Sequence, residues 1–481
     1  MRESLRFLPL FLIYLPAIDK ITKFPFLKNI LIIGAGKSSP ALVSYLNQQA
    51  NAFDWQITIA DKNLGLLHKI SHNQTHVEIT GLDVLDEEAR DAIVQKADLV
   101  LSMVPARFHP LVLESCIKAV VDLITPSYQS KEMLALQPEV TQAGILVLNE
   151  MGLDPGIDHM SAMKVINQIK QKGYKITCFE SFTGGLMAPG SDNNEWKYKF
   201  SWNPRNVVMA GQGGTVRFLH NGKYKYIPYN RLFRRTERIN IEGYGSFEGY
   251  ANRDSLQYID KYKLQGTETI YRGTLRRPGF CRAWDMFVQL GATDDSYIME
   301  GSEDMTYRDF INSFLPYNPY DSVELKFMHY LRIDQDSDLK EKLFELEIFS
   351  NKKIGLKNAT PAQILEHILL QKWTMQPKDQ DMVVMWHKFF YHNVKERLQQ
   401  TSSMVVQGKN SDETAMAKTV GLPMGIAAKL VLQGKINLKG LQLPVVREIY
   451  QPVLQELEHY DIKFNDNIFS QTNHEDDRPI F

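Results

Sequence analysis

The sequence predicts an α/β protein: an N-terminal doubly wound parallel sheet of the Rossmann type, then a second mixed α/β domain that carries an all-α insertion. Three observations lead to this fold class. Short apolar runs alternate with helical patterns through residues 29–152, and a Gly-x-Gly turn follows the first of these runs. Strand-like alternation then resumes late in the chain, after a long helical stretch.

The same patterns divide the chain into segments. We predict a leader at residues 1–28 and a first domain at residues 29–152. A discontinuous second domain comprises residues 153–290 and 379–470, and a helical insertion at residues 291–378 separates its two parts. Residues 471–481 form a tail. The apolar part of the leader is interrupted by Pro9 and Pro16, and no Ala-x-Ala cleavage site follows it. These features favour a dispensable or misassigned leader over an export signal.

The composition excludes some classes of partner. The chain has 481 residues, of which 44% are apolar and 23% charged, and its net charge is −1. This balance is typical of a globular protein and gives no reason to expect nucleic acid or a membrane as partner. Cys116, Cys178 and Cys281 are widely spaced and odd in number, so we expect no metal site, no disulfide framework and a cytoplasmic location.

The first apolar run, residues 29–33, leads directly into Gly34-Ala-Gly36, and Pro40 then opens a helical pattern. Strand, Gly-x-Gly and helix are the context that a dinucleotide fingerprint requires. Gly34 would make the tight turn, Gly36 would let a pyrophosphate approach the backbone, and the helix N-terminus would face the phosphates. Ser39 stands in the place of the third glycine.

An acidic residue follows the second predicted strand. Residues 56–60 form that strand, and Asp61 comes directly after it. A carboxylate there can accept hydrogen bonds from both ribose hydroxyls of NAD, and it would repel the additional phosphate of NADP. Asp61 therefore slightly favours NAD, while the neighbouring Lys62 leaves NAD or NADP open. In the alternative interpretation Asp61 only caps a turn.

Four further runs, residues 77–80, 99–104, 120–125 and 144–148, complete the predicted parallel sheet. Because parallel strands end at one edge of a sheet, the polar residues after them should line a single crevice. These residues are Asp83, Ser102, Arg107, His109, Ser127 and Tyr128.

A sharp turn at residues 153–156 joins the last of these strands to the next helix. Pro155 fixes its own φ, and Gly156 tolerates a positive φ, so the chain can change direction there. We interpret Asp158 as the N-cap of the helix and His159 as a structural neighbour of the helix end. Asp154 is left at the strand end, where α/β enzymes place reactive groups.

The second domain combines basic, amide and aromatic residues in its loops. Residues 175–182 alternate as a strand, and residues 183–189 read as a glycine-rich loop. Three clusters follow, at residues 192–205, 247–256 and 271–276. Arginine presents a planar fork to carboxylates, so the clusters suit a small substrate with several carboxylates. Ordinary surface arginines are the alternative.

The remainder of the chain contains no evident chemistry. Residues 291–378 are helical and charged, which is typical of a structural insertion. Residues 381–390 and 397–407 alternate as two strands, and we predict a hairpin that joins the sheet of the second domain. Small residues dominate residues 414–432, which predicts a tightly packed helix.

Five stretches carry a resemblance to a known family: residues 149–159, 184–186, 198–202, 252–255 and 272–276. Through them the chain resembles the saccharopine dehydrogenase family, in its glutamate-forming branch, from residue 29 to about residue 467. The resemblance implies a Rossmann domain, a mixed α/β domain for substrate and dimerisation, an all-α insertion and a homodimer. It also implies oxidation of the secondary amine of saccharopine by NAD or NADP, followed by hydrolysis to glutamate and 2-aminoadipate 6-semialdehyde, or the reverse reaction.

The resemblance also assigns site residues. Cofactor contacts fall on the loop after the first strand, on the ends of later strands and on one position of the second domain: Gly34, Ala35, Gly36, Lys37, Ser38, Asp61, Lys62, Asn63, Asp83, Val84, Val104, Leu153, Asp154, Pro155 and Asn203. Substrate contacts fall on Ser127, Tyr128, Asp154, Arg253, Gly273, Thr274 and Leu275. Arg253 would bind one carboxylate, and the backbone amides of residues 273–275 another. Asp154 and Tyr128 are the expected catalytic residues, which move protons or orient the amine and water.

The sequence departs from the pattern of the branch at three places. Thr183 stands where such reductases often have a cysteine, Ala106-Arg107 replaces a Tyr-Thr pair, and Pro126 replaces a serine. These changes leave the reaction class intact but leave the substrate and the choice between NAD and NADP open.

Two other functions compete with this interpretation. One is a related dehydrogenase that couples a different amine and carbonyl, of the carboxynorspermidine-forming type. Arg253, Arg272 and Arg276 favour a polycarboxylate over such a polyamine substrate. The other is a non-catalytic protein that senses nucleotide, and the presence of Tyr128, Asp154 and Arg253 argues against it.

Overall fold

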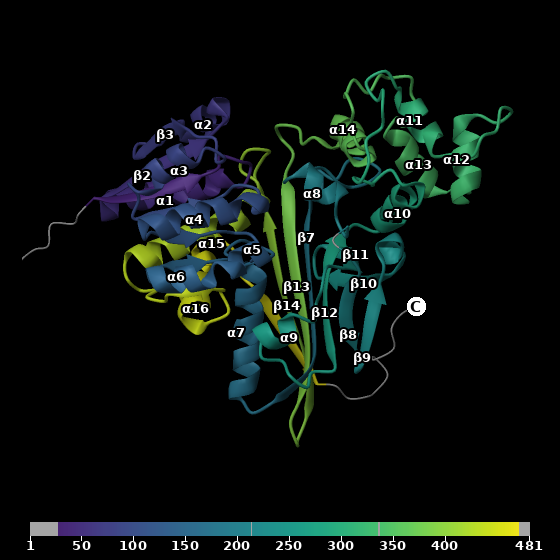
Figure 1. The fold of residues 1–481 in the computed structure, drawn as a ribbon. Helices are drawn as coiled ribbons and strands as arrows, with labels where there is room; N and C mark the ends of the chain where they lie inside the picture. Colours follow the sequence, from purple (N-terminus) through teal and green to yellow (C-terminus); the bar gives the residue numbers. More distant parts are fainter. Residues whose placement is uncertain (1–26, 213, 335–336, 471–481) are drawn as a thin grey trace, which may run out of the picture.

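The computed structural model describes residues 27–212, 214–334 and 337–470. Nearly all of the predicted leader and the whole predicted tail lie outside these ranges. Within them the strands form one sheet of seven strands and one of nine. Figure 1 shows the N-terminal sheet and its helices beside the long strands of the second sheet, with a cluster of helices above the second sheet. The predicted α/β class is confirmed.

The first sheet is parallel throughout, in the order β15-β6-β5-β4-β1-β2-β3. Apart from the two edge strands, β3 and β15, its strands are largely buried apolar runs, as expected where helices cover both faces of a sheet. Its first six strands in chain order are β1 (Lys28–Ile33), β2 (Trp55–Asp61), β3 (Val77–Gly81), β4 (Leu99–Ser102), β5 (Asp122–Ile124) and β6 (Leu146–Leu148). The helical segments between them are α1 (Ser39–Phe53), α2 (Leu64–Ser71), α3 (Glu87–Val94), η1 (Ala106–Phe108), α4 (His109–Ala119), α5 (Lys131–Ala135) and α6 (Gln137–Ala143).

The C-terminal part of the chain returns to this first domain. β15 (Gly440–Gln442) pairs with β6, α15 (Ala415–Leu432) packs on α1, and α16 (Arg447–Leu457) packs on α7 (Ile157–Gln171). Figure 1 shows α15 and α16, in yellow, among the blue helices. The assignment of all of residues 379–470 to the second domain is therefore wrong for this segment.

Glycines allow this close packing of α15 on α1. A Cβ on Gly421 would lie 2.7 Å from the backbone nitrogen of Leu42, and one on Gly425 would lie 2.6 Å from the Tyr45 ring. α15 has the length and composition of a membrane-crossing helix, but 72% of its 18 residues are buried inside the protein. The predicted tight packing of this small-residue helix is confirmed.

Seven of the nine strands of the second sheet follow the order β10-β11-β12-β7-β13-β14-β16, while β8 pairs with β12 and β9 pairs with β8. β12 and β7 are the only parallel neighbours in this sheet within the described residues. β13 and β14 form the predicted hairpin. The strands are β7 (Lys175–Met187), β8 (Val216–His220), β9 (Lys223–Ile227), β10 (Thr236–Ile241), β11 (Gly245–Ala251), β12 (Thr269–Arg276), β13 (Asp381–His392), β14 (Arg397–Gln407) and β16 (Asn465–Ser470). Short helical segments accompany them at α8 (Pro204–Val208), η2 (Tyr229–Arg234), α9 (Tyr258–Lys261) and η3 (Glu458–Tyr460).

The glycine-rich loop predicted at residues 183–189 is wrong, because β7 continues through Met187. A Cβ on Gly184 would lie 2.7 Å from the carbonyl oxygen of Leu275, and one on Gly185 would lie 2.5 Å from Met416. The two glycines therefore let neighbouring chain approach the strand rather than form a turn.

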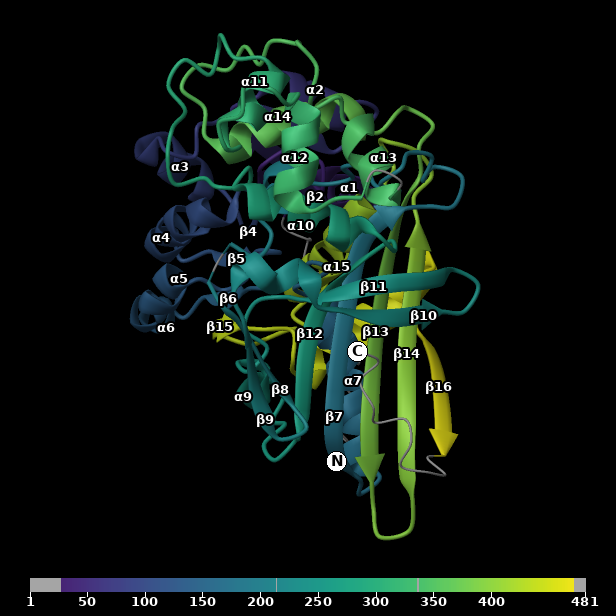
Figure 2. The ribbon, with the colours of Figure 1, turned by 90° about the vertical axis from the view of Figure 1, so that its right-hand side faces the viewer.

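The insertion is helical, with α11 (Tyr307–Ser313), α12 (Val323–Leu331), α13 (Asp338–Glu345) and α14 (Pro361–Trp373) following α10 (Phe280–Leu290). Its apolar side chains share one core with a face of the second sheet. Figure 2, turned by 90°, shows these helices above one end of the long strands. Another core joins β1, α1, α7, β13 and α15, so the two sheets and the helices between them pack as one body.

Candidate active site

The turn between β6 and α7 is built for one conformation. Gly156 has φ +145°, and a Cβ there would lie 2.0 Å from the carbonyl oxygen of Gly152, so only glycine fits. The Asp154–Pro155 peptide bond is cis. The amide of Ile157 donates to the carbonyl of Gly152 at 3.0 Å, which closes the turn. The predicted positive φ is confirmed, and the turn presents Asp154.

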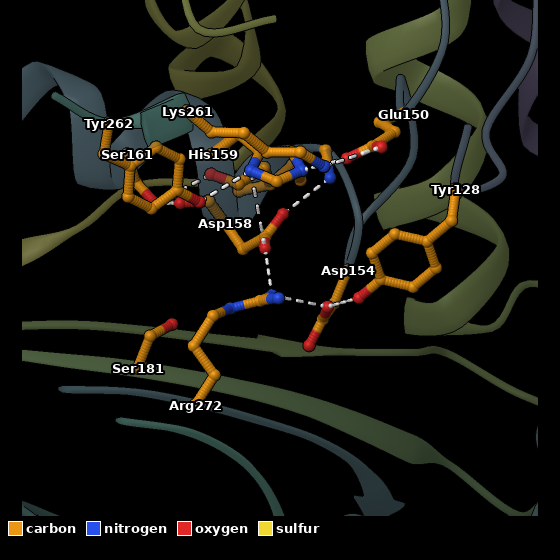
Figure 3. A network of polar contacts seen from close by, with 12 residues as sticks. Tyr128, Glu150, Asp154, Asp158, His159, Ser161, Ser181, Lys261, Tyr262 and Arg272 are labelled. Carbon is orange, nitrogen blue, oxygen red and sulfur yellow. Dashed lines mark hydrogen bonds and ion pairs between the residues drawn. The ribbon is translucent and has the colours of Figure 1, made fainter. Parts of the chain in front are cut away.

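Two donors converge on one oxygen of Asp154. The Tyr128 hydroxyl donates to Oδ1 at 2.7 Å, and Nη2 of Arg272 donates to the same oxygen at 2.8 Å (Figure 3). Burial opposes ionisation of Asp154, but the Arg272 charge and the Tyr128 hydrogen bond outweigh it and lower the pKa of the carboxyl. Burial and the nearby Asp154 charge raise the pKa of Tyr128 well above its usual value. At neutral pH the pair is a carboxylate and a neutral phenol.

Asp158 is not the N-cap that the sequence predicts. α7 begins at Ile157, and Asp158 is buried in its first turn. Its Oδ1 accepts from the Gly156 amide at 2.6 Å, while its Oδ2 accepts from Nη2 of Arg272. Burial raises the pKa of Asp158 despite the cation beside it. Arg272 therefore bridges two carboxylates.

His159 joins a second buried group of polar residues behind Asp158. Its Nε2 lies 2.6 Å from Oε2 of Glu150, and its Nδ1 lies 2.6 Å from the Tyr262 hydroxyl. Lys261 donates to Oε1 of Glu150 at 3.3 Å (Figure 3). Burial disfavours ionised Glu150, but the hydrogen bond and charge of its neighbours lower its pKa to about 2. The group links the β6–α7 turn to α9 of the second domain.

Of the three arginines that favoured a polycarboxylate, one is exposed. Arg253 has φ +53°, and its guanidinium lies 4.8 Å from the centre of the Tyr128 ring. Arg272 and Arg276 are 5% and 3% exposed, and Arg276 stacks on the ring of Tyr198. The argument from three substrate-facing arginines is therefore wrong for two of them.

The backbone expected to bind a second carboxylate lies inside the second sheet. Residues 273–275 belong to β12, which is paired with β11 on one side and β7 on the other. A Cβ on Gly273 would lie 2.2 Å from the Phe182 ring. The segment lies between two partner strands, and Gly273 serves close packing there. The binding of a substrate carboxylate by these amides stays a prediction.

Ser127 is held by a buried histidine that sequence reasoning did not assign to the site. Nε2 of His109 lies 2.8 Å from the Ser127 hydroxyl and 3.0 Å from that of Thr125, and Nδ1 lies 2.8 Å from the Ser102 hydroxyl. Burial lowers the pKa of His109 to about 4, so the ring is neutral. Its position among the polar residues that follow the strands was the signal that could have identified it.

The Gly-x-Gly turn fits a pyrophosphate. Gly34 has φ +113°, and a Cβ there would lie 2.8 Å from the backbone of Met103, next to Val104. Gly36 is exposed, and a Cβ on it would meet nothing within 4 Å, so no protein group requires glycine there. The first turn of α1 has no side-chain cap from Ser38, which leaves its amides available to an anion.

Several of the remaining predicted cofactor residues lie at the ends of β2 and β3. Asp61 accepts from the Ala35 amide through Oδ2 and from the Asn63 amide through Oδ1, both at 2.8 Å. Lys62 is exposed next to it. The other two positions lie after β3, at Asp83 and Val84, where Asp83 caps the following turn.

Four more assigned positions complete this description. Lys37 is exposed at the start of α1, and Leu153 and Pro155 flank Asp154 in the turn. Asn203 is the N-cap of α8 in the second domain, where its Oδ1 accepts from the Arg205 amide at 3.0 Å.

Taken together, the parallel sheet, the glycine turn and the acid at the end of β2 define a nucleotide-binding oxidoreductase fold. Comparison with known proteins gives the family. Residues 30–148 match the Saccharopine dehydrogenase NADP binding domain, and residues 152–462 match the Saccharopine dehydrogenase C-terminal domain. The chain belongs to the saccharopine dehydrogenase family and is an NAD(P)-binding oxidoreductase, which confirms the family to which the motifs pointed.

Individual relatives are similar over most of the chain. It is 32% identical over 443 residues to saccharopine dehydrogenase (NADP(+), L-glutamate-forming) of Saccharomyces cerevisiae, covering 89% of this chain and 96% of that protein. It is 32% identical over 446 residues to the mitochondrial alpha-aminoadipic semialdehyde synthase of Mus musculus, covering 91% of this chain but 47% of that longer protein. The apo structure of the Saccharomyces cerevisiae saccharopine dehydrogenase (L-Glu forming) superposes with a TM-score of 0.83 at 30% identity, over 92% of this chain and 100% of that one.

Proposed function

We propose that this protein interconverts saccharopine with glutamate and 2-aminoadipate 6-semialdehyde, using NAD or NADP. The observation that carries the proposal is the meeting of Tyr128, Asp154 and Arg253 at the β6–α7 turn. An anion, a phenol and an exposed guanidinium are what a substrate with an amine and several carboxylates requires. Two relatives that the chain covers almost completely are named as L-glutamate-forming saccharopine dehydrogenases, which supports the same reaction.

The reaction makes modest demands on the protein. The secondary amine first loses a proton to solvent, which frees the nitrogen lone pair. A C–H bond beside the nitrogen then breaks, its electron pair leaves as hydride, and the lone pair forms the C=N bond of an iminium. Water then adds to that carbon, and cleavage of the C–N bond releases an aldehyde and the amine of glutamate. A bound nicotinamide nucleotide supplies the hydride acceptor. The residues around the Gly34 turn and the end of β2 would hold it.

Asp154 and Tyr128 act on the nitrogen. Because two donors stabilise the carboxylate, Asp154 is an anion that can hold the cationic amine and the iminium. The Tyr128 hydroxyl donates its hydrogen bond to Asp154 and keeps its proton, so its oxygen can accept a hydrogen bond from the amine or from the attacking water. Arg253, stacked on the Tyr128 ring, would anchor one substrate carboxylate beside them.

Two observations bear on the nucleotide in opposite directions. Asp61 ends β2 in the position of a ribose acceptor, which favours NAD. Both of its oxygens already accept from backbone amides, and exposed Lys62 stands next to it to meet an additional phosphate. We propose that either nucleotide serves, and the ratio of kcat/KM for the two measures the balance.

We further propose a cytoplasmic homodimer. Cys116, Cys178 and Cys281 are buried and form no disulfide within the described part of the chain, in keeping with a reducing compartment. The resemblance to the family supports the dimer. Light scattering of the purified chain should give twice the monomer mass, and cell fractionation should place the protein with cytoplasmic markers. A monomer, or a sediment with organelles, would contradict these two proposals.

The activity is tested with purified protein, saccharopine and either NAD or NADP. Absorbance of the reduced nucleotide should rise with saccharopine and stay flat with a carboxylated polyamine of similar length. A signal only with the polyamine would favour the carboxynorspermidine-type alternative. Nucleotide binding without turnover of either amine would instead indicate a sensor.

A further inference from the structure

Arg272 lies beneath the proposed reacting centre rather than in an open pocket. It extends from β12 toward the β6–α7 turn, is 5% exposed, and its guanidinium carbon lies 4.1 Å from the centre of the Tyr258 ring. Figure 3 shows its end group between Asp154 and Asp158. One nitrogen, Nη2, donates to both carboxylates, at 2.8 Å for Asp154.

The backbone around Arg272 is held by the same motif that places Arg253. The Arg272 amide donates to the buried hydroxyl of Ser255 at 3.0 Å, and its carbonyl accepts from the Asn252 amide at 2.9 Å. Residues 252–255 therefore position two arginines with different surroundings. Arg253 is exposed and forms no ion pair with any carboxylate in the described ranges, whereas Arg272 is paired twice.

This arrangement places a cation between two neighbouring buried carboxylates. The turn and the first helical turn of α7 bring Asp154 and Asp158 to the same guanidinium, and both are largely removed from water. Two carboxylates that share a site cannot both ionise readily unless a cation lies between them. Asp158 also accepts from the Gly156 amide, so it is fixed from a second direction and fixes Arg272 in turn.

We propose that Arg272 is a positioning residue that keeps Asp154 a carboxylate facing the substrate nitrogen, that Asp158 is the buried counter-anion that holds Arg272 in place, and that neither binds substrate. The proposal rests on the proposed function for the identity of the nitrogen. In this proposal Arg253 binds the substrate carboxylate, and Arg272 keeps Asp154 ionised.

Four variants test it. Arg272→Met removes the cation and should move the acid limb of the kcat/KM profile to higher pH, while Arg272→Lys, which keeps a charge, should stay near wild type. Asp158→Asn keeps an acceptor for the Gly156 amide but leaves Asp154 as the one carboxylate paired with Arg272. The acid limb of the profile should therefore move to lower pH. In each direction the ratio of kcat/KM at optimal to acidic pH should change roughly tenfold. The double variant Arg272→Met with Asp158→Asn should recover toward wild type.

Arg276→Met is the matched control. Arg276 lies on the same strand, is 3% exposed, stacks on Tyr198 and donates to the Leu275 carbonyl, so it is a buried arginine without a carboxylate ion pair among the described residues. Its loss should leave the acid limb where it is. If Arg272→Met does not fold, Asp158→Asn and Arg272→Lys still decide the question.

A second readout needs no turnover. Infrared difference spectra of the substrate-free protein follow the protonation of Asp154, which Asp154→Asn identifies by loss of its band. This band should titrate at higher pH in Arg272→Met and at lower pH in Asp158→Asn. Unmoved titration in both, or a raised KM for saccharopine without rescue in the double variant, would overturn the proposal. Failure of wild type to oxidise saccharopine would contradict the proposed function, but this titration would still test whether Arg272 and Asp158 control the ionisation of Asp154.

Discussion

At the scale of single residues, ionisation decides what Asp154 can do. Arg272 and Tyr128 both donate to one of its oxygens, and its lowered pKa makes it a weak base at neutral pH. Its contribution should therefore come from its charge rather than from taking up a proton. Its partners lie 118 and 26 residues away in the sequence.

Asp154→Asn tests this role. The amide keeps the shape and loses the charge, so kcat/KM for saccharopine should fall by at least about tenfold, corresponding to about 1.5 kcal/mol or more for a hydrogen bond to a charged group. Affinity for the nucleotide, measured by fluorescence of the reduced form, should change less. A loss confined to nucleotide affinity would place Asp154 on the cofactor instead.

His109 provides a prediction about pH. Its pKa is lowered to about 4 in the folded chain, below the usual value of 6.5, because the ring is buried. The unfolded chain therefore binds the proton more readily, so this contribution to stability is complete above about pH 6.5 and is lost as the pH falls toward about 4. The full difference is about 3 kcal/mol.

Urea unfolding between about pH 7 and about pH 5 measures this effect. The free energy of unfolding of wild type should fall more steeply with decreasing pH than that of His109→Asn, which has no proton to gain. The same variant should raise KM for saccharopine, since Ser127 loses the partner that orients its hydroxyl. Parallel pH slopes would show that His109 binds its proton equally well in the folded and the unfolded chain, which would contradict the lowered pKa.

At the scale of elements, glycines act through packing. α15 meets α1 at Gly421, where a Cβ would lie 2.7 Å from the Leu42 backbone nitrogen. Gly421→Ala should therefore destabilise the protein by about 2 kcal/mol, although alanine favours a helix. Gly65→Ala is the control, because that helical glycine meets only the Asn63 side chain, at 3.3 Å. It should be neutral or slightly stabilising in thermal unfolding, and equal losses at both sites would contradict the packing argument.

The same packing explains which elements could be predicted. Apolar runs such as β1 and β2 could be predicted from the sequence, because their local composition alone indicates burial. Glycines at 184 and 185 resemble a loop locally, and only the approach of Leu275 and Met416 shows why they lie in a strand. β15 has three half-buried residues and no periodicity, so nothing local marks it as a strand of the first sheet.

Site residues divide in the same way. Asp154, Tyr128 and Ser127 could be placed because they follow parallel strands, whose ends meet at one edge. Asp158 looked like a helix cap because its type and position suit one, but the guanidinium of Arg272 comes from β12 and outweighs that preference. An ion pair between residues far apart in the chain cannot be predicted from the local sequence around either residue.

At the scale of the whole molecule, the chain crosses between the two sheets more than once. β15, α15 and α16 complete the first domain from the C-terminal end, and one core contains residues of both sheets. A fragment of residues 1–152 would expose Leu42, Tyr45 and Leu46, which are buried in the full chain. We expect it to aggregate and to bind no nucleotide, while the full chain unfolds in one cooperative transition.

Circular dichroism and nucleotide binding check this expectation. Supplying residues 409–470 in trans should restore part of the structure, since that segment brings back the strand and helices that the fragment lacks. A folded, nucleotide-binding fragment of residues 1–152 would show that the first domain is independent.

The most direct test of the central claim is the identity of the products. Saccharopine can be oxidised on either side of its secondary amine, which gives glutamate with 2-aminoadipate 6-semialdehyde, or lysine with 2-oxoglutarate. The protein is mixed with saccharopine and NAD or NADP, and the products are identified by mass spectrometry. We expect glutamate and the semialdehyde in amounts equal to the reduced nucleotide. Lysine with 2-oxoglutarate, or no product with either nucleotide, would contradict the account.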